Sequence, residues 1–274
     1  MAIRRAYVDG PHGQIHLRQV GDGVPLLLLH QSPLSGGQFE AVLPLLADRG
    51  FAAVAMDTPG FGQSDRPAAP VGIAGYADSI PAVLDALGWS AAHVLGHHTG
   101  ASIAASFAAR YPELVDRLVL NGLALLSAEE RAHFAQFRFA PLKPQAEGSH
   151  LLAAWNQRIA ASPGWTHLYA MHRYVAEMLA NSEFYFWGFE AAFAHDLAAD
   201  LMSVKAPTLV LTNTGEDLYA ASQRAHALRS DFTFAELKGG THDIVDEQPE
   251  AWTNVVEAFL LQHDAQYLNQ IRFP

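Results

Sequence analysis

The chain has 274 residues, of which 50% are hydrophobic, enough to bury the core of one large α/β domain or of one domain with an insertion. It carries 17 Lys and Arg against 28 Asp and Glu, and no basic run that would follow phosphates, which excludes nucleic acid as an expected partner. The absence of cysteine excludes disulfides, thiolate catalysis and cysteine-ligated metals. The chain begins without an apolar signal segment and contains no run of about 18 apolar residues, so we expect a cytoplasmic protein that does not bind or span a membrane.

Short runs of apolar residues bounded by Gly, Pro, Asp or Asn predict the strands. The first run, 14–20, alternates polar and apolar residues and is typical of an outer antiparallel strand. Continuous apolar runs, typical of strands buried on both faces of a parallel sheet, follow at 24–30, 51–57, 92–96, 116–122, 206–213 and 232–239. Helical patterns lie between them at 36–49, 75–88, 99–111, 217–229 and 245–263. This alternation predicts an α/β fold with a mostly parallel sheet covered by helices on both faces.

The alternation breaks once, between residues 123 and 205. That stretch has helical patterns interrupted by Pro and Gly, contains no convincing strand, and holds most of the large aromatic residues. We therefore expect a core formed by 1–122 and 206–274, with a helical cap formed by 123–205.

The segment "GHHTG" at 96–100 lies between a predicted strand and a predicted helix. In hydrolases this layout normally presents a serine at a sharp turn, as Gly-x-Ser-x-Gly, whereas the middle residue here is His98. The turn drives its central residue towards positive φ, which histidine tolerates better than most residues, and Gly96 and Gly100 leave room for close packing. Because the helix begins at this residue, its dipole disfavours a charged ring, and we expect His98 to be neutral at pH 7.

With these landmarks, the chain resembles the cap-bearing type of the α/β-hydrolase superfamily over essentially its whole length. The matching segments stand in the family's order and are "HQSP" (30–33), "DTPGFGQSD" (57–65), "GHHTG" (96–100), "TNTGEDLY" (212–219) and "GGTHDIVDEQP" (239–249). The resemblance implies the α/β-hydrolase fold, with the inserted helices covering the elbow. It also implies structural roles for His30, His97 and Asp57.

The family's chain order of nucleophile, acid and histidine implies a catalytic set for this sequence. His98 takes the nucleophile position, Asp217 the acid position and His242 the position of the general base. Glu216, next to Asp217, is the alternative acid.

The resemblance also implies the surroundings of the reacting carbonyl. The backbone N–H groups of Thr99 and Ser32 are the expected oxyanion donors, and Gln31 stands where the family has glycine. The expected roof of the site comes from the cap residues Trp155, Tyr185 and Trp187. An aromatic roof over a neutral catalytic cluster favours a small apolar or aromatic substrate.

Three classes of function stay open at this point. The first is a cofactor-free hydrolase of an ester, a lactone or an activated C–C bond, with His98 as nucleophile or as proton relay. The second is a lyase, decarboxylase or cofactor-independent oxygenase that uses the same cluster for proton transfer. The third is a ligand-binding protein with a vestigial site, against which the presence of Asp217 and His242 argues. No cofactor or metal is expected, the partner is a small-molecule substrate, and a homo-oligomer stays possible.

Overall fold

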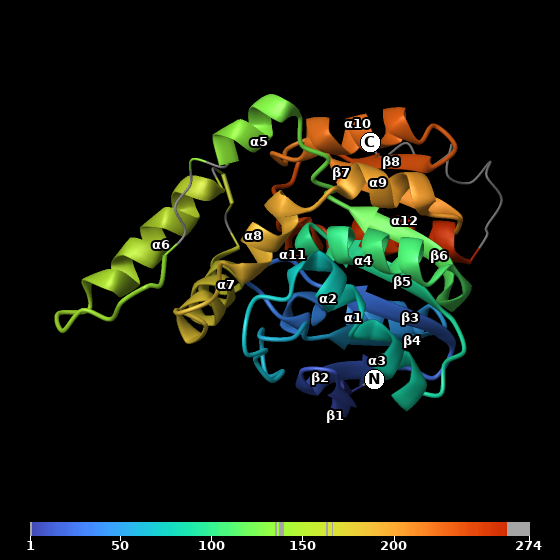
Figure 1. Cartoon of the computed structure of the whole chain (residues 1–274), viewed down its shortest axis with the longest axis horizontal. Helices are drawn as coiled ribbons and strands as arrows, with labels where there is room; N and C mark the ends of the chain where they lie inside the picture. Colours follow the sequence, from blue (N-terminus) through green and yellow to red (C-terminus); the bar gives the residue numbers. More distant parts are fainter. Residues whose placement is uncertain (1, 135, 137–139, 163, 166, 262–274) are drawn as a thin grey trace.

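The computed structural model describes residues 2–134, 136, 140–162, 164–165 and 167–261. Its centre is an eight-stranded sheet with the strand order β1-β2-β4-β3-β5-β6-β7-β8 (Figure 1). The strands are β1 Arg4–Gly10, β2 Gly13–Val20, β3 Val24–Leu29, β4 Phe51–Met56, β5 Ala92–His97, β6 Val115–Asn121, β7 Thr208–Asn213 and β8 Thr233–Leu237. β1 and β2 are antiparallel to their neighbours, and all pairs from β4 to β8 are parallel. The predicted α/β fold with a mostly parallel sheet is therefore confirmed.

One strand was missing from the prediction. β1 forms the edge of the sheet, so the segment predicted as the outer strand, now β2, lies second from that edge. β1 escaped detection because its sequence, "RRAYVDG", is partly exposed along its length and lacks an apolar run.

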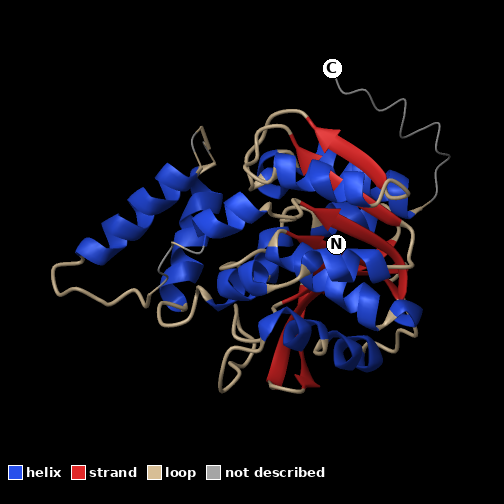
Figure 2. Cartoon of the chain, turned by 45° about the horizontal axis from the view of Figure 1, so that its top comes forward, coloured by secondary structure: helices blue, strands red, loops and turns tan. Residues whose placement is uncertain are grey.

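Helices cover both faces of the sheet, as Figure 2 shows. On one face the sheet packs against α2 Gly72–Ala77, α3 Ile80–Ala86, α4 Thr99–Arg110, α9 Leu197–Ser203 and α10 Tyr219–Leu228. On the other it packs against the short helices η1 Gly36–Phe39 and α11 Ile244–Glu247, and against α1 Leu43–Asp48 and α12 Pro249–Leu260. A further short turn of helix, η2 Pro112–Leu114, precedes β6.

Three predicted helices each divide into two. The breaks fall where Pro44, Pro81 and Pro249 begin α1, α3 and α12. Proline has no N–H to donate and is compatible with the first turn of a helix but not with its interior, so each proline starts a new helix.

Between β6 and β7 the regular elements among the described residues are all helices. These are α5 Ala128–Phe134, α6 Ser149–Ala161, α7 Leu168–Ala180, α8 Trp187–Ala194 and α9. Helices α5–α8, called the inserted helices below, project from one side of the sheet (Figure 1). α9 differs, because Leu197, Leu201 and Val204 join the buried cluster beneath α4. The stretch expected to form a cap thus includes one helix that packs within the core layers.

Of the helices described here, none combines the length and the apolar character needed to cross a membrane.

Candidate active site

The turn between β5 and α4 places His98 at its apex. His98 has φ 53° and ψ −110°, and it is the one non-glycine residue with positive φ among those that the structure describes. A Cβ atom on Gly96 would lie 2.0 Å from the carbonyl oxygen of Gly100, and one on Gly100 would lie 2.1 Å from that of Leu29. Both glycines are therefore required by backbone packing, and the sharp elbow is built around a histidine.

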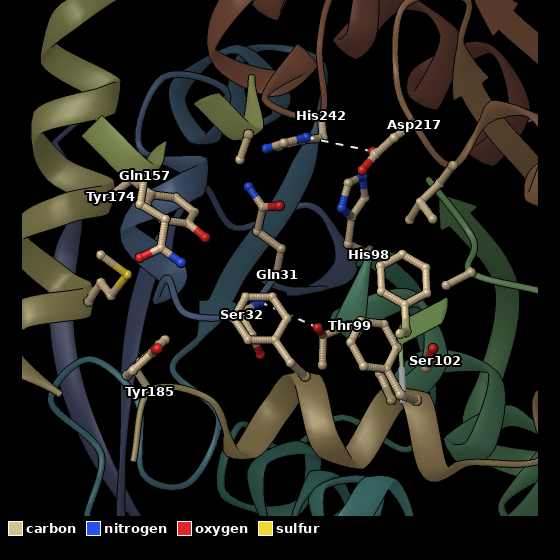
Figure 3. Close-up of a pocket in the computed structure, with 18 residues that line it drawn as sticks. Gln31, Ser32, His98, Thr99, Ser102, Gln157, Tyr174, Tyr185, Asp217 and His242 are labelled. Atoms are coloured by element: carbon tan, nitrogen blue, oxygen red, sulfur yellow. Dashed lines mark hydrogen bonds and ion pairs between the residues drawn. The ribbon is translucent and has the colours of Figure 1, made fainter. Parts of the chain in front are cut away.

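A buried carboxylate holds the His98 ring. Nε2 of His98 lies 2.9 Å from Oε2 of Glu216, whose side chain is 0% exposed. The other oxygen, Oε1, accepts hydrogen bonds from the hydroxyl of Thr212 and, at 3.3 Å, from the N–H of Asn213. The remaining ring nitrogen, Nδ1, faces the space next to Gln31 (Figure 3). Glu216 thus orients a histidine whose second nitrogen is directed into the site.

The pKa of His98 is raised above its ordinary value, contrary to the expectation from the helix dipole. Burial on its own lowers this pKa, but the hydrogen bond to Glu216 and the negative charges of Glu216, Asp217 and Asp243 outweigh burial. The helix dipole is outweighed because the Glu216 carboxylate, in the turn after β7, lies against the ring.

His242 faces two different surroundings with its two ring nitrogens. Nδ1 lies 3.7 Å from Oδ1 of Asp217, and the neighbouring ring lowers the pKa of Asp217 to about 2. Nε2 lies 2.9 Å from the hydroxyl of Ser162 and contacts Nη1 of Arg158. The rings of His242 and His98 are 5.8 Å apart between centroids. The structure therefore brings the expected set together but directs Nε2 of His242 towards α6.

The side chain of Arg158 extends from α6 and places a buried positive charge next to the core. Its Nη2 forms an ion pair with Asp243, and its guanidinium carbon lies 4.7 Å and 3.9 Å from the ring centroids of Trp165 and Tyr174. Asp243 also accepts a hydrogen bond of 2.9 Å from the side-chain amide of Gln31. The cation is thus neutralised and enclosed where α6 meets the segment that bears His242.

The expected oxyanion donors lie at the floor of the site. Thr99 is the first residue of α4, where a helix leaves the N–H without an intrahelical acceptor. The N–H of Ser32 lies 3.4 Å from the Thr99 hydroxyl, a long contact. The N–H of Gln31 is bonded to Gln38 at 2.9 Å and is not free to bind substrate.

A cavity of about 280 Å³ opens above these groups (Figure 3). Its polar side is lined by Gln31, Ser32, His98, Thr99, Ser102, Asp217 and His242. Its apolar side is lined by Ala124, Phe134, Met178, Tyr185, Phe189, Ala192, Phe193 and Leu218. Gln157 and Ala161 of α6 and Tyr174 of α7 complete the lining. The site is therefore a largely apolar chamber with most of its polar groups beside the elbow, and with the Gln157 amide and the Tyr174 hydroxyl on the side of the inserted helices (Figure 3).

Of the three aromatic residues expected in the roof, the cavity wall contains Tyr185. Trp155 and Trp187 do not line this cavity as far as the described residues define it. Trp155 packs against both small apolar clusters of the inserted helices. Trp187 lines a separate hollow with Arg66 and Phe184.

Residues 24–165 match the sequence profile described as the alpha/beta hydrolase fold. The chain belongs to this family. The 2-(acetamidomethylene)succinate hydrolase of Mesorhizobium japonicum is 26% identical over 263 residues, which cover 89% of this chain and 92% of that protein. An uncharacterized protein of Mycobacterium tuberculosis is 37% identical over 135 residues, but the match spans only 49% of this chain and 38% of that protein's length.

Two solved structures share the fold of this α/β-hydrolase family member over nearly the whole chain. The enol-lactonase from Burkholderia xenovorans LB400 gives a TM-score of 0.78 at 20% identity, with 93% of this chain and 100% of that chain covered. An epoxide hydrolase from an endophytic Streptomyces gives 0.77 at 21% identity, with 95% and 96% covered. At these identities the likeness establishes the fold.

Around the site of this family member, three residues expected to be structural hold the loops. Nε2 of His30 accepts a hydrogen bond of 3.0 Å from the N–H of Thr58, and His97 contacts the amide of Gln38 below the elbow. The buried carboxylate of Asp57 accepts backbone N–H groups from two loops. Burial lowers the pKa of His97 well below its ordinary range. These contacts fasten the loops that form the floor of the cavity.

Sequence reasoning missed two contacts of the site. It treated Glu216 only as a rival of Asp217, although two adjacent carboxylates after one strand and two histidines nearby were a signal that each acid has its own partner. It did not single out Arg158, whose one signal was a lone cation within an apolar helical pattern. Its contact with His242 joins residues 84 positions apart, and no spacing rule connects them.

Proposed function

We propose that the protein is a cofactor-free hydrolase that cleaves an ester, a lactone or an activated C–C bond of a small apolar or aromatic carbonyl compound. One observation carries this proposal. The elbow presents an imidazole, with one nitrogen held by a buried carboxylate and the other facing an apolar cavity floored by the N–H groups of Ser32 and Thr99. This arrangement combines a base or nucleophile with donors for a developing oxyanion.

The size and lining of the cavity support the substrate class. A volume of about 280 Å³ accommodates a small molecule, and part of the wall is formed by apolar side chains such as Met178, Phe189 and Leu218. Apolar walls with a few convergent polar groups are typical of small-molecule sites. The names of the Mesorhizobium and Burkholderia proteins, a hydrolase and a lactonase, support hydrolysis as the reaction type.

Hydrolysis at this site has two routes. In the first, His98 attacks the carbonyl carbon, the alcohol leaves, and water cleaves the resulting acyl-imidazole. In the second, a histidine takes a proton from water while the water oxygen attacks, and the proton then passes to the leaving oxygen as the C–O bond breaks. In both routes the negative charge on the carbonyl oxygen is stabilised by the floor N–H groups.

Turnover of a panel of chromogenic aryl esters and lactones tests the proposal. The wild type is compared with His98→Ala, His242→Ala and free imidazole, because any imidazole slowly cleaves activated esters. His172→Ala serves as the matched control, since His172 is exposed on α7 and does not line the cavity. We expect the wild type and the control to exceed free imidazole by orders of magnitude, and His98→Ala to lose this excess.

Two results would redirect the assignment. A wild type no faster than free imidazole would contradict hydrolysis of simple carbonyl compounds and favour a lyase or other proton-transfer enzyme. Rapid-quench mass spectrometry then separates the two hydrolytic routes, because an acyl adduct on His98 occurs only in the first.

A further inference from the structure

We infer that the general base of the site is Nδ1 of His98, positioned by Glu216, and that His242 does not take the proton. This inference rests on the proposed hydrolytic function, and it assigns the roles within that site differently from the family's order of nucleophile, acid and base.

The hydrogen of the neutral His98 ring is on the nitrogen that faces Glu216. Glu216 Oε1 already accepts from Thr212 and Asn213, which leaves Oε2 to face Nε2 of His98 at 2.9 Å. A carboxylate only accepts hydrogen bonds, so Nε2 carries a hydrogen. In the neutral ring, the lone pair is therefore on Nδ1.

Packing of the His98 ring fixes the direction of Nδ1. The ring of His98 lies tightly against the end of β6, where a Cβ on Gly122 would be 2.2 Å from Cδ2 of the ring. The ring is thus held between Gly122 and Glu216, with Nδ1 facing the cavity (Figure 3). No hydrogen bond to Nδ1 occurs within the part of the chain that the structure describes. The lone pair is oriented and free.

His242 differs from His98, because its Nε2 is already in contact with a hydrogen-bond donor. Its Nε2, the nitrogen that faces the nucleophile in the usual arrangement, contacts the guanidinium of Arg158 and the hydroxyl of Ser162, and it lies 3.6 Å from Oδ2 of Asp243, which is itself paired with Arg158. Arg158 is 3% exposed and fixed by its ion pair with Asp243, so this contact is an anchored one. A guanidinium only donates, and it therefore occupies the lone pair that a base needs.

His98 alone can carry out both proton transfers of the reaction. Nδ1 takes a proton from water as the water oxygen bonds to the carbonyl carbon, and the carbonyl electron pair moves onto oxygen beside Ser32 and Thr99. The proton then passes from Nδ1 to the leaving oxygen as the C–O bond breaks. The Glu216 carboxylate stabilises the imidazolium between the two transfers, which agrees with the raised pKa of His98.

Two neighbouring isosteric substitutions, Glu216→Gln and Asp217→Asn, test the inference. In Glu216→Gln, Thr212 and Asn213 hold the amide oxygen in place of Oε1, so the NH₂ group faces Nε2 of His98 and donates to it. The ring is then forced to carry its hydrogen on Nδ1, and the lone pair no longer faces the cavity. We expect kcat on an aryl ester to fall by on the order of 100-fold with KM little changed, whereas Asp217→Asn loses less than about 10-fold.

Nitrogen NMR of the histidine rings gives a readout that does not depend on turnover. We expect His98 to carry its hydrogen on Nε2 in the wild type and in Asp217→Asn, and on Nδ1 in Glu216→Gln. If Glu216→Gln does not fold, Thr212→Val, which removes only the hydroxyl that holds the carboxylate, should give a smaller fall in kcat and a mixed tautomer.

Three results would contradict the inference or the proposed function. A larger loss of kcat in Asp217→Asn than in Glu216→Gln would overturn the inference and restore His242 as base. A wild type without esterase activity would contradict the proposed function, but the tautomers would still decide the role of Glu216. Nδ1–H in the wild type would overturn that role.

Discussion

Glu216 and Asp217 are adjacent in the chain, yet their carboxylates face different histidines. Glu216 lies 2.9 Å from His98 with its side chain 0% exposed, and Asp217 lies 3.7 Å from His242 with its side chain 68% exposed. Water and salt screen the exposed pair, whereas the buried pair keeps most of its electrostatic interaction. The site thus contains two histidine–carboxylate pairs of unequal burial, and the more deeply buried one is at the elbow.

The pH dependence of turnover should follow His98. A base acts in its neutral form, so kcat/KM is expected to rise with pH through the pKa of His98, which Glu216 raises above its ordinary value. Asp217, with a pKa of about 2, stays ionised over the pH range of the assay and adds no inflection to the pH–rate profile. The measurement is a pH–rate profile between pH 4 and 9. An acidic limb that is unchanged in Glu216→Gln would contradict this origin, because loss of the carboxylate lowers the pKa of His98.

Replacing Gly122 by alanine should abolish turnover while leaving a folded protein. The new Cβ would lie 2.2 Å from the His98 ring, and the φ of +63° adds backbone strain of about 1–3 kcal/mol. Gly72→Ala is the matched control, since its φ is +67° and nothing lies within 4 Å of the new atom. Thermal unfolding and esterase assays should show destabilisation in both variants and loss of activity in Gly122→Ala only. Equal activity in the two variants would mean that the ring has room to move.

The buried pair of Arg158 and Asp243 should be strongly coupled. Arg158→Met leaves the carboxylate of Asp243 buried with the Gln31 amide, and we expect the free energy of unfolding to fall by about 3–5 kcal/mol. Asp243→Asn in the same chain removes the unpaired charge and should recover part of this loss. A double-mutant cycle in urea measures the coupling, and additive effects within about 0.5 kcal/mol would show that the pair does not interact.

Glu177 on α7 should make stability depend on pH. Burial raises its pKa from 4.5 to about 7, against the lowering effects of Ser35 and Arg173 and of the more distant Arg18, while Asp57 raises it further. A raised carboxyl pKa means that the free energy of unfolding falls as pH rises from about 4.5 to about 7, by at most about 3 kcal/mol.

Glu177→Gln should therefore be more stable than the wild type at pH 8 and similar to it at pH 4.5. Thermal unfolding at the two pH values checks this, with Glu183→Gln as control because that side chain is 78% exposed. An equal gain at both pH values would point to packing rather than to ionisation.

The core of the fold was predictable because strands buried on both faces have continuous apolar sequences, as β3 and β7 do. The positions of His98 and His242 were predictable for a related reason, since loops that follow parallel strands meet at one edge of the sheet. Side-chain partners were not, because the choice between Glu216 and Asp217 depends on which way each side chain points after β7. The role of Arg158 could not be predicted, because helical periodicity does not indicate where an inserted helix packs against the core.

The contact between Arg158 and His242 means that the inserted helices do more than shape the chamber. Replacing the insertion between β6 and β7 on this core would also remove the cation beside a core histidine. Chimaeras made by grafting another insertion onto this core should therefore change the hydrogen-bond partner of His242 along with the lining of the cavity. One side chain thus connects the helices that line the cavity to a histidine of the core.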